Sequence, residues 1–286
     1  MILVVGSTGL LGGAITRRLL ATAQPVRILQ RDNPAAQTWI DQGAAAVKGD
    51  LRDRASLDAA CAGVDVVITT AIARFFDGGD FQSVDLQGTK NLIDAAKAAG
   101  AKQFIYTSAY GSTKDAPAEL MRVKAEVEEY LKASGVPYTI LQPAVFMEVW
   151  IGAVIGIPLQ AGQPVTLVGH GNHHHHFIAV DNIAEIAVKA IGNPKAINQM
   201  IPIGSTRASW TEIVQMVAHA TKRQIPVQYV PIGTPLPLLP DIFNALMWGM
   251  ETYESSIDMK HWRQVFNVKL DSIEDFARRT FVAHPA

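Results

Sequence analysis

Short runs of consecutive apolar residues alternate with longer stretches of helical periodicity through the first half of the chain. The first run, residues 1–5, ends at Gly6, and the stretch 10–21 that follows has apolar residues at helical spacing. Because continuous apolar runs suit strands that are buried on both faces, this alternation predicts an α/β fold with a doubly wound parallel sheet. Further strands are predicted at 26–30, 44–47, 64–68, 103–107 and 138–141, and helices at 56–61, 84–99 and 119–134.

The pattern changes after about residue 145, where Gly, Pro and large apolar side chains are mixed. Regular order returns with a predicted strand at 177–180, a helix at 181–191 and a strand at 199–203. Ser209 followed by Glu212 is typical of a capping box and predicts a helix from residue 210.

The sequence therefore predicts two domains. Residues 1–145 form the sheet domain, and 177–204 return to it. Residues 146–176 and 205–286 form a smaller α+β lobe, which we expect to bind a substrate or a partner. Within that lobe, 230–250 is rich in Pro and in large apolar residues. These side chains suit an ordinary core, a pocket for an apolar substrate, or an exposed patch for a partner protein or membrane surface.

Composition narrows the class of protein. Of 286 residues, 49% are apolar and 18% are charged, with 25 Lys and Arg against 26 Asp and Glu. This balance disfavours a nucleic-acid partner, which requires a basic surface. Cys61 is the single cysteine, so a reducing cytoplasm is expected. The longest uncharged apolar run, 149–159, is too short to predict a transmembrane segment.

A glycine-rich turn connects the first strand to the first helix. Its sequence GSTGLLG occupies residues 6–12. In this strand–turn–helix context the glycines permit a tight turn, a close approach to a pyrophosphate and close helix packing, and the helix N-terminus attracts the phosphates. The turn therefore predicts a dinucleotide site. The expected contacts are Gly6, Thr8, Gly9, Leu10, Leu11 and Gly12.

The end of the second strand bears on which dinucleotide binds. An NAD site usually has an acidic residue there, whereas this chain has Gln30 followed by Arg31. A guanidinium pairs well with a 2′-phosphate, so NADP(H) is preferred over NAD(H). Asp32 leaves NAD(H) open, and Arg31 could instead be a surface residue paired with Asp32.

Several further motifs carry a family resemblance. The spacing GxxGxxG, the segment GDL at 49–51, the segment TTA at 69–71 and the strand FIYTS at 104–108 occur together with a helix and strand over 124–143. In these features the chain resembles the NmrA-like subgroup of atypical short-chain dehydrogenases/reductases. The likeness is strongest over 1–145 and 177–190 and weak after 205.

The resemblance implies a Rossmann fold that binds NAD(P) and assigns further residues to the cofactor. Asp50 and Leu51 would contact the adenine, and Thr70 and Ala71 would lie beneath its ribose. Lys124 would contact the nicotinamide ribose. Pro143 and Phe146 would pass near the nicotinamide amide.

One departure from the family pattern concerns catalysis. Ordinary members place a tyrosine four residues before the lysine, as the proton donor, but here Leu120 precedes Lys124. The candidate catalytic residues are therefore Lys124, Ser108 and Tyr110, whereas Tyr106 is expected to pack within its strand. Alternatively, Lys124 could be a solvent-facing helix residue.

Two functions fit this pattern. One is an NADP(H)-dependent oxidoreductase that reduces a small apolar carbonyl, quinone or activated double bond. The other, which the missing tyrosine favours, is a non-catalytic NADP(H)-binding sensor, regulator or assembly factor of the NmrA-like type. A monomer is slightly favoured over a dimer.

Histidines cluster at His170 and at 173–176. Imidazoles bind transition metals, but an extended chain turns alternate residues to opposite sides, and no carboxylate or thiol lies in the same stretch. We therefore expect no functional metal site, and either surface exposure or a ligand contact by one histidine.

Overall fold

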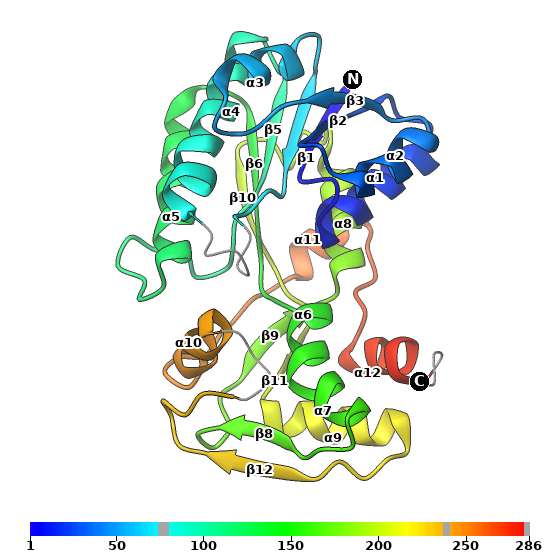
Figure 1. Ribbon diagram of the computed structural model, residues 1–286, viewed down its shortest axis with the longest axis vertical. Helices are drawn as coiled ribbons and strands as arrows, with labels where there is room; N and C mark the ends of the chain where they lie inside the picture. The colour runs from blue at the N-terminus through cyan, green and yellow to red at the C-terminus, as the bar shows by residue number, and fades with distance from the viewer. Residues whose placement is uncertain (74–79, 237–240, 283–286) are drawn as a thin grey trace. The chain divides into compact units, whose positions relative to one another are not determined.

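The computed structural model describes residues 1–73, 80–236 and 241–282, which divide into two compact units. Figure 1 shows the elements of both. Unit 1 comprises Met1–Gln142, Ile183–Ile201 and Trp262–Val268, and unit 2 comprises the remaining segments, Pro143–Asn182, Pro202–His261 and Lys269–Ala286.

Unit 1 is built on a seven-stranded sheet with the strand order β10-β6-β5-β4-β1-β2-β3. The chain reverses its direction of travel across the sheet between β3 and β4, as in a doubly wound fold, and the pairings of β1 with β2 and β4 are parallel. The prediction of a parallel α/β sheet is therefore confirmed. The strands are β1 (Ile2–Val5), β2 (Val26–Gln30), β3 (Ala45–Lys48), β4 (Val66–Thr69), β5 (Gln103–Thr107), β6 (Tyr138–Pro143) and β10 (Gln199–Ile203).

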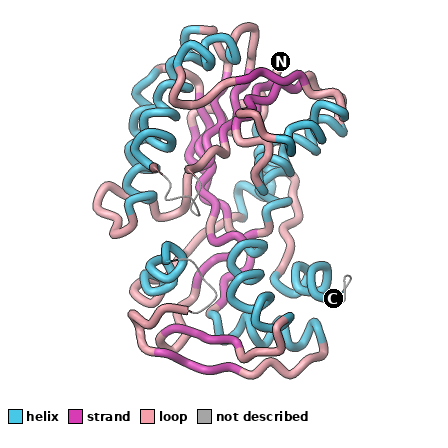
Figure 2. Tube along the Cα trace, viewed as in Figure 1, coloured by secondary structure: helices cyan, strands magenta, loops and turns pink. Residues whose placement is uncertain are grey.

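Helices cover both faces of this sheet (Figures 1 and 2). On one face, apolar side chains of α3, α4 and α5, among them Leu57, Leu92 and Val127, form one buried cluster with side chains of the strands. On the other face lie α1 and α8. Burial on both sides explains why the strands are apolar without alternation. The helices are α1 (Leu10–Ala21), α2 (Gln37–Asp41), α3 (Arg54–Cys61), α4 (Thr89–Ala98), α5 (Glu119–Ser134), α8 (Val180–Ala190) and α11 (Lys260–Phe266).

Unit 2 contains two small sheets with the strand orders β11-β9-β7 and β12-β8. Its core includes Phe177 and Trp210, whose ring centroids are 5.3 Å apart. The capping box of Ser209 and Glu212 is present at the start of α9, as predicted. The elements are β7 (Val145–Phe146), β8 (Val165–Val168), β9 (His175–Ile178), β11 (Thr206–Ala208), β12 (Val227–Val230), α6 (Met147–Ile151), α7 (Ile157–Gln160), α9 (Trp210–Thr221), α10 (Asp241–Met250) and α12 (Ile273–Ala277).

Several predicted elements have shifted bounds, for example the strand expected at 64–68, which is Val66–Thr69, and two further differences have a clear cause. The helix expected over 84–99 is α-helical only from Thr89, and its first residues belong to a π-helical stretch, Phe81–Gly88, which begins after Asp80, whose side chain accepts the Ser83 N–H. The strand expected at 177–180 instead begins at His175, which pairs with Ala208 of β11. Residues 237–240 of the proline-rich segment lie outside the described residues. Within the described part of the chain, no helix has the length and apolar character needed to cross a bilayer.

Candidate functional site

The glycine-rich turn packs so tightly that side chains are excluded at two of its glycines. Gly6 has φ +92°, and a Cβ there would lie 2.8 Å from Thr70 Oγ1 and 2.9 Å from the Ala71 nitrogen. A Cβ on Gly12 would overlap the Gly6 carbonyl oxygen. The structure thus brings Gly6, Gly12, Thr70 and Ala71 together at the carboxyl ends of β1 and β4.

The N-terminus of α1 is open to an anion. Gly9 is its N-cap, without a side-chain hydrogen bond, and its first turn contains no acidic residue. The first hydrogen bond of the helix joins the Gly13 N–H to the Gly9 carbonyl, at 2.8 Å. The N–H groups of Leu10 and Leu11 therefore have no carbonyl one turn earlier in the helix to bind. Thr8 and Leu10 are exposed, whereas Leu11 packs into the core. Backbone N–H groups and the helix dipole together favour a phosphate here.

Charged side chains gather where β2 and β3 end. Arg52 binds Asp50 through two bonds, Nε to Oδ1 at 2.9 Å and Nη2 to Oδ2 at 2.8 Å, and Arg31 Nη1 lies 3.9 Å from the same carboxylate. The hydrogen bonds from Arg52 lower the Asp50 pKa to about 2. Asp32 pairs with Lys48 at 2.6 Å rather than with Arg31. Arg31 therefore remains largely exposed, with Asp50 as its nearest acidic partner.

Leu51, Pro143 and Phe146 lie at three different places in the structure. Leu51 is buried, and its Cβ would lie 2.7 Å from a Cβ at Gly88. Pro143 ends β6, and Phe146 lies in β7, where it pairs with Ile178 of β9. Pro143 and Phe146 both belong to unit 2.

Lys124 is buried at the carboxyl end of β5. Its side chain comes from α5, its Nζ donates to the Thr107 carbonyl at 3.0 Å, and it lies 5.4 Å from the centroid of the Tyr106 ring. Burial lowers the Lys124 pKa, and the charges of Asp85 and Glu128 oppose that shift. The alternative of a solvent-facing lysine is wrong, because only 7% of Lys124 is exposed.

Two of the other candidate catalytic residues follow β5 directly. Ser108 is buried, and its Oγ has no hydrogen-bond partner among the described residues, although its backbone N–H binds the Leu141 carbonyl at 2.8 Å. Tyr110 is half-buried in the turn beyond. Tyr106 lies in the strand and is buried, as predicted, and burial raises its pKa well above the usual value. Leu120 is also buried.

Asp85 is a buried acid that the sequence analysis missed. Its Oδ2 accepts the Ala73 N–H at 2.9 Å, and burial raises its pKa. The positions Asp85, Thr89, Leu92 and Ala96 share one helical face, and all are buried. The sequence signal that could have identified Asp85 is a carboxylate on a mostly apolar helical face, because charged residues are rarely buried without a role.

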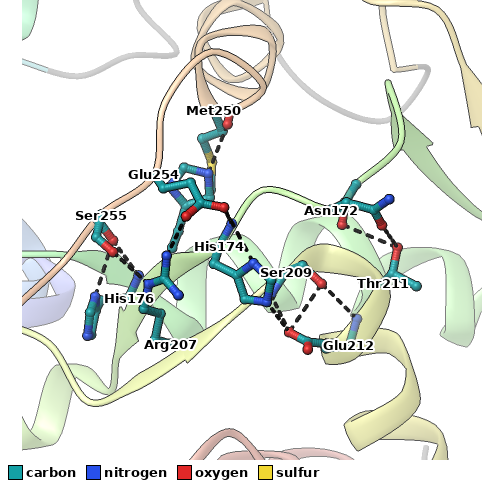
Figure 3. A network of polar contacts seen from close by, with 12 residues as sticks. Asn172, His174, His176, Arg207, Ser209, Thr211, Glu212, Met250, Glu254 and Ser255 are labelled. Atoms are coloured by element: carbon teal, nitrogen blue, oxygen red, sulfur yellow. Dashed lines mark hydrogen bonds and ion pairs between the residues drawn. The ribbon is translucent and has the colours of Figure 1, made fainter.

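Three of the five clustered histidines, His174, His175 and His176, are held by polar contacts within unit 2 (Figure 3). His174 lies between two carboxylates, with Nε2 3.1 Å from Glu212 and Nδ1 3.5 Å from Glu254. His175 and His176 are buried, which corrects the expectation of surface exposure for these two. Their side-chain partners come from segments 38 or more residues away, so no local pattern could reveal them. Among the described residues, no group of acidic, cysteine and histidine side chains could hold a metal ion.

The segment 250–255 supplies most of the contacts to these histidines. His175 Nε2 lies 2.9 Å from the Met250 carbonyl, and the Ser255 Oγ accepts the His176 N–H at 2.6 Å. Burial lowers the pKa of both imidazoles. The structure therefore gives His175 and His176 a structural role in unit 2, as neutral rings that anchor the chain after α10.

Comparison with known proteins decides the family. The model of the NmrA-like family matches residues 1–274. This chain belongs to the NmrA-like family. The match covers both units, which agrees with the glycine turn and the parallel sheet of unit 1.

Members of the NmrA-like family with different roles are similar to this chain. Photosystem II assembly factor Ycf39 of Cyanophora paradoxa is 32% identical over 276 residues, which cover 95% of this chain and 85% of that protein. An NAD(P)H azoreductase of Xenophilus azovorans is 32% identical over 234 residues, covering 81% and 77%. The family relatives thus include both reductases and assembly factors.

A solved structure supports the fold. NADPH-dependent quinone oxidoreductase QOR2 of Escherichia coli, in complex with NADPH, matches with a TM-score of 0.82 at 22% identity, over 98% of this chain and all of that one. At this identity the likeness concerns the NmrA-like fold as a whole.

Proposed function

We propose that this chain binds NADP(H) and uses it to reduce a small apolar carbonyl, quinone or activated double bond. The observation that carries the proposal is the α1 N-terminus, which has no side-chain cap and no acid in its first turn and follows a turn in which Gly6 and Gly12 exclude any Cβ. A helix start without a side-chain cap or an acidic residue suits the diphosphate of a dinucleotide.

Buried polar atoms at the same strand ends also fit a bound dinucleotide. Ser7 follows β1, and Ser108 follows β5, and the hydroxyl of each is buried without a partner among the described residues. An unpaired buried hydroxyl is costly, so a ligand that completes its hydrogen bonding would be favoured. Thr107 contributes a third such oxygen.

The preference for NADP(H) follows from the charges around Arg31. Lys48 already pairs with Asp32, so the acid that could select a ribose 2′-hydroxyl is engaged. Arg52 occupies both oxygens of Asp50, which leaves Arg31 with only a 3.9 Å contact to that carboxylate. Arg31 can therefore turn toward a 2′-phosphate at little cost.

The bound nicotinamide would supply a hydride, and the protein would have to supply a proton. Lys124 is the best candidate for that proton, because burial lowers its pKa and so makes its ammonium a stronger acid. The Ser108 hydroxyl, without a partner in the described chain, can bind the substrate oxygen or relay the proton. The relatives named as NAD(P)H azoreductase and as NADPH-dependent quinone oxidoreductase favour an electron-poor apolar acceptor.

The test combines cofactor binding with turnover. Binding of NADPH is measured by calorimetry, and its oxidation is followed at its absorbance maximum with quinones, azo dyes and aldehydes as acceptors. Ser108→Ala removes a hydroxyl without a partner, so it should keep or slightly raise stability while turnover falls at least tenfold. Lys124→Met should abolish turnover while NADPH still binds. Full turnover in both variants would contradict the proposed proton supply.

A second function is favoured by one specific feature, the buried Leu120 in the position of the usual tyrosine. Without that acid the chain could bind NADP(H) without catalysis, as a sensor or assembly factor. Its similarity to Ycf39 assembly factors over 95% of the chain supports this alternative. Tight NADPH binding with no oxidation on any acceptor would decide for it.

A further inference from the structure

The segment 31–41, which follows β2, binds back to the glycine-rich turn at two points. The indole Nε1 of Trp39 donates to the Ser7 carbonyl oxygen at 2.9 Å. The Asn33 Nδ2 donates to the Thr8 hydroxyl at 3.2 Å. Trp39 is half-buried on the short helix α2, and Ser7 is almost completely buried. The same segment therefore carries Arg31 and contacts the turn through Asn33 and Trp39.

Gly13 provides the space for the indole. A Cβ on Gly13 would lie 3.3 Å from Trp39 Cζ2 and 3.4 Å from the Ser7 carbonyl oxygen, closer than most side-chain contacts. Gly13 is one residue beyond the glycines of the dinucleotide motif, so the motif itself does not require it. The indole thus lies in a notch between α1 and the turn.

The hydrogen bond to Ser7 fixes the direction of the next amide. A trans peptide is planar, and its C=O and N–H point in opposite directions. Because Trp39 holds the Ser7 C=O, the Thr8 N–H is directed away from the indole. The following N–H, that of Gly9, is already engaged with the Gly6 carbonyl at 2.9 Å. Trp39 therefore constrains the direction in which the Thr8 N–H points.

We infer that Trp39 is a positioning residue of the dinucleotide site, which holds the Thr8 N–H in the orientation that binds the diphosphate. This inference rests on the proposed binding of NADP(H). The diphosphate is common to NADPH and NADH, so loss of the indole N–H weakens both equally. Loss of the Arg31 guanidinium, in contrast, would weaken the binding of NADPH alone, because Arg31 would contact only the 2′-phosphate. Preorganised donors bind better because their ordering precedes association.

Calorimetry with NADPH and NADH tests the inference. Trp39→Phe keeps an aromatic ring in the notch but lacks the N–H, and it should raise both dissociation constants by the same factor, about threefold to tenfold. Trp262→Phe is the matched control: Trp262 is also half-buried in unit 1, stacked on Phe266 at 5.6 Å, and this variant should keep the wild-type constants.

A spectroscopic measurement on the wild type does not depend on how well the variant folds. In a proton–nitrogen NMR spectrum each tryptophan gives one indole signal, and the signal of Trp39 is assigned by its loss in Trp39→Phe or by elimination with the other four tryptophans. This signal should shift when NADPH is added, because the carbonyl that it binds belongs to the turn that contacts the ligand.

The outcomes separate the inference from the proposed function. Unchanged dissociation constants in a folded Trp39→Phe, or a Trp39 indole signal that does not move while NADPH binds, would overturn the role of Trp39 alone. Selective weakening of NADPH over NADH would also overturn it, since the effect would then concern the 2′-phosphate. If wild-type protein binds no NADPH at millimolar concentration, the proposed function fails and the inference fails with it.

Discussion

Gln103, at the start of β5, accepts the backbone N–H of Gly192 at 2.8 Å, across 89 residues of sequence. The same side chain donates to the Ala190 carbonyl and to the Thr139 hydroxyl, both at 2.9 Å. All of these groups lie in unit 1, and the Gln103 side chain is almost completely buried. One amide thus joins two strands of the sheet to the end of α8.

Gln103→Leu should lower the free energy of unfolding by roughly 2–4 kcal/mol, since it leaves several buried polar groups without partners. Urea unfolding followed by circular dichroism measures the change. Gln228→Leu is the control, because Gln228 is exposed on β12 and its bond to Thr166 lies at the surface. An equal effect of the two variants would contradict the role assigned to Gln103.

Gly12→Ala should lower the free energy of unfolding by roughly 1–3 kcal/mol and should abolish NADPH binding, because the added methyl group overlaps the Gly6 carbonyl. Gly152→Ala provides the opposite case. Gly152 has helical φ and ψ of −57° and −49°, and a Cβ there meets nothing within 4 Å. This variant should be more stable by about 0.5–1 kcal/mol. Thermal unfolding of both variants checks the pair, and NADPH binding by Gly12→Ala would refute the tight turn.

Arg31→Ala should weaken NADPH by about tenfold and leave NADH nearly unchanged, since only NADPH carries the 2′-phosphate. Calorimetric titration with both dinucleotides measures the ratio. Arg223→Ala serves as the control, because Arg223 is exposed in unit 2 and follows α9. Equal weakening of the two dinucleotides by Arg31→Ala would remove the case for the phosphate.

Acid should destabilise unit 2 through His175 and His176. Burial lowers the pKa of both rings in the folded protein, so the folded state prefers them neutral. Stability that is present above the unfolded pKa of about 6.5 is therefore lost as the pH falls below it. The titratable and charged groups that act on His175 are His173, Glu254 and Arg207, and Arg207 also acts on His176.

Melting temperatures at pH 7.5, 6.5 and 5.5 measure this dependence. A double variant, His175→Leu with His176→Leu, should melt lower at every pH but lose much of the decline between pH 6.5 and 5.5. His219→Leu, at an exposed position on α9, should retain the wild-type decline. A double variant with the full decline would show that other groups cause it.

Local features of the sequence predicted much of the fold. Helices α1 and α5 and strands β2 and β5 have the expected bounds, because each is delimited by nearby glycines, caps or changes of periodicity. The capping box of α9 could also be predicted, because Ser209 and Glu212 are close together in the sequence. The strand–turn–helix context placed the glycine turn, the family resemblance added Thr70 and Ala71, and the structure shows that Gly6 and Gly12 lie beside Thr70.

Contacts between distant segments could not be predicted in this way. Nothing near His174 in the sequence indicates Glu212 or Glu254, and nothing near Ser7 indicates Trp39. The sequence left the burial of Lys124 open, because packing against β5 decides which face of α5 is covered. These relationships depend on how the chain returns to itself, and periodicity carries no such information.

The four consecutive histidines of this chain have a practical consequence for its purification. In the native protein two of the rings are enclosed and a third is held by Glu212 and Glu254, so a nickel-charged resin should retain the folded chain only weakly. After denaturation in urea all four imidazoles become available, and retention should increase sharply. Elution from such a column would then report, without any added tag, how much of a preparation has lost its native structure.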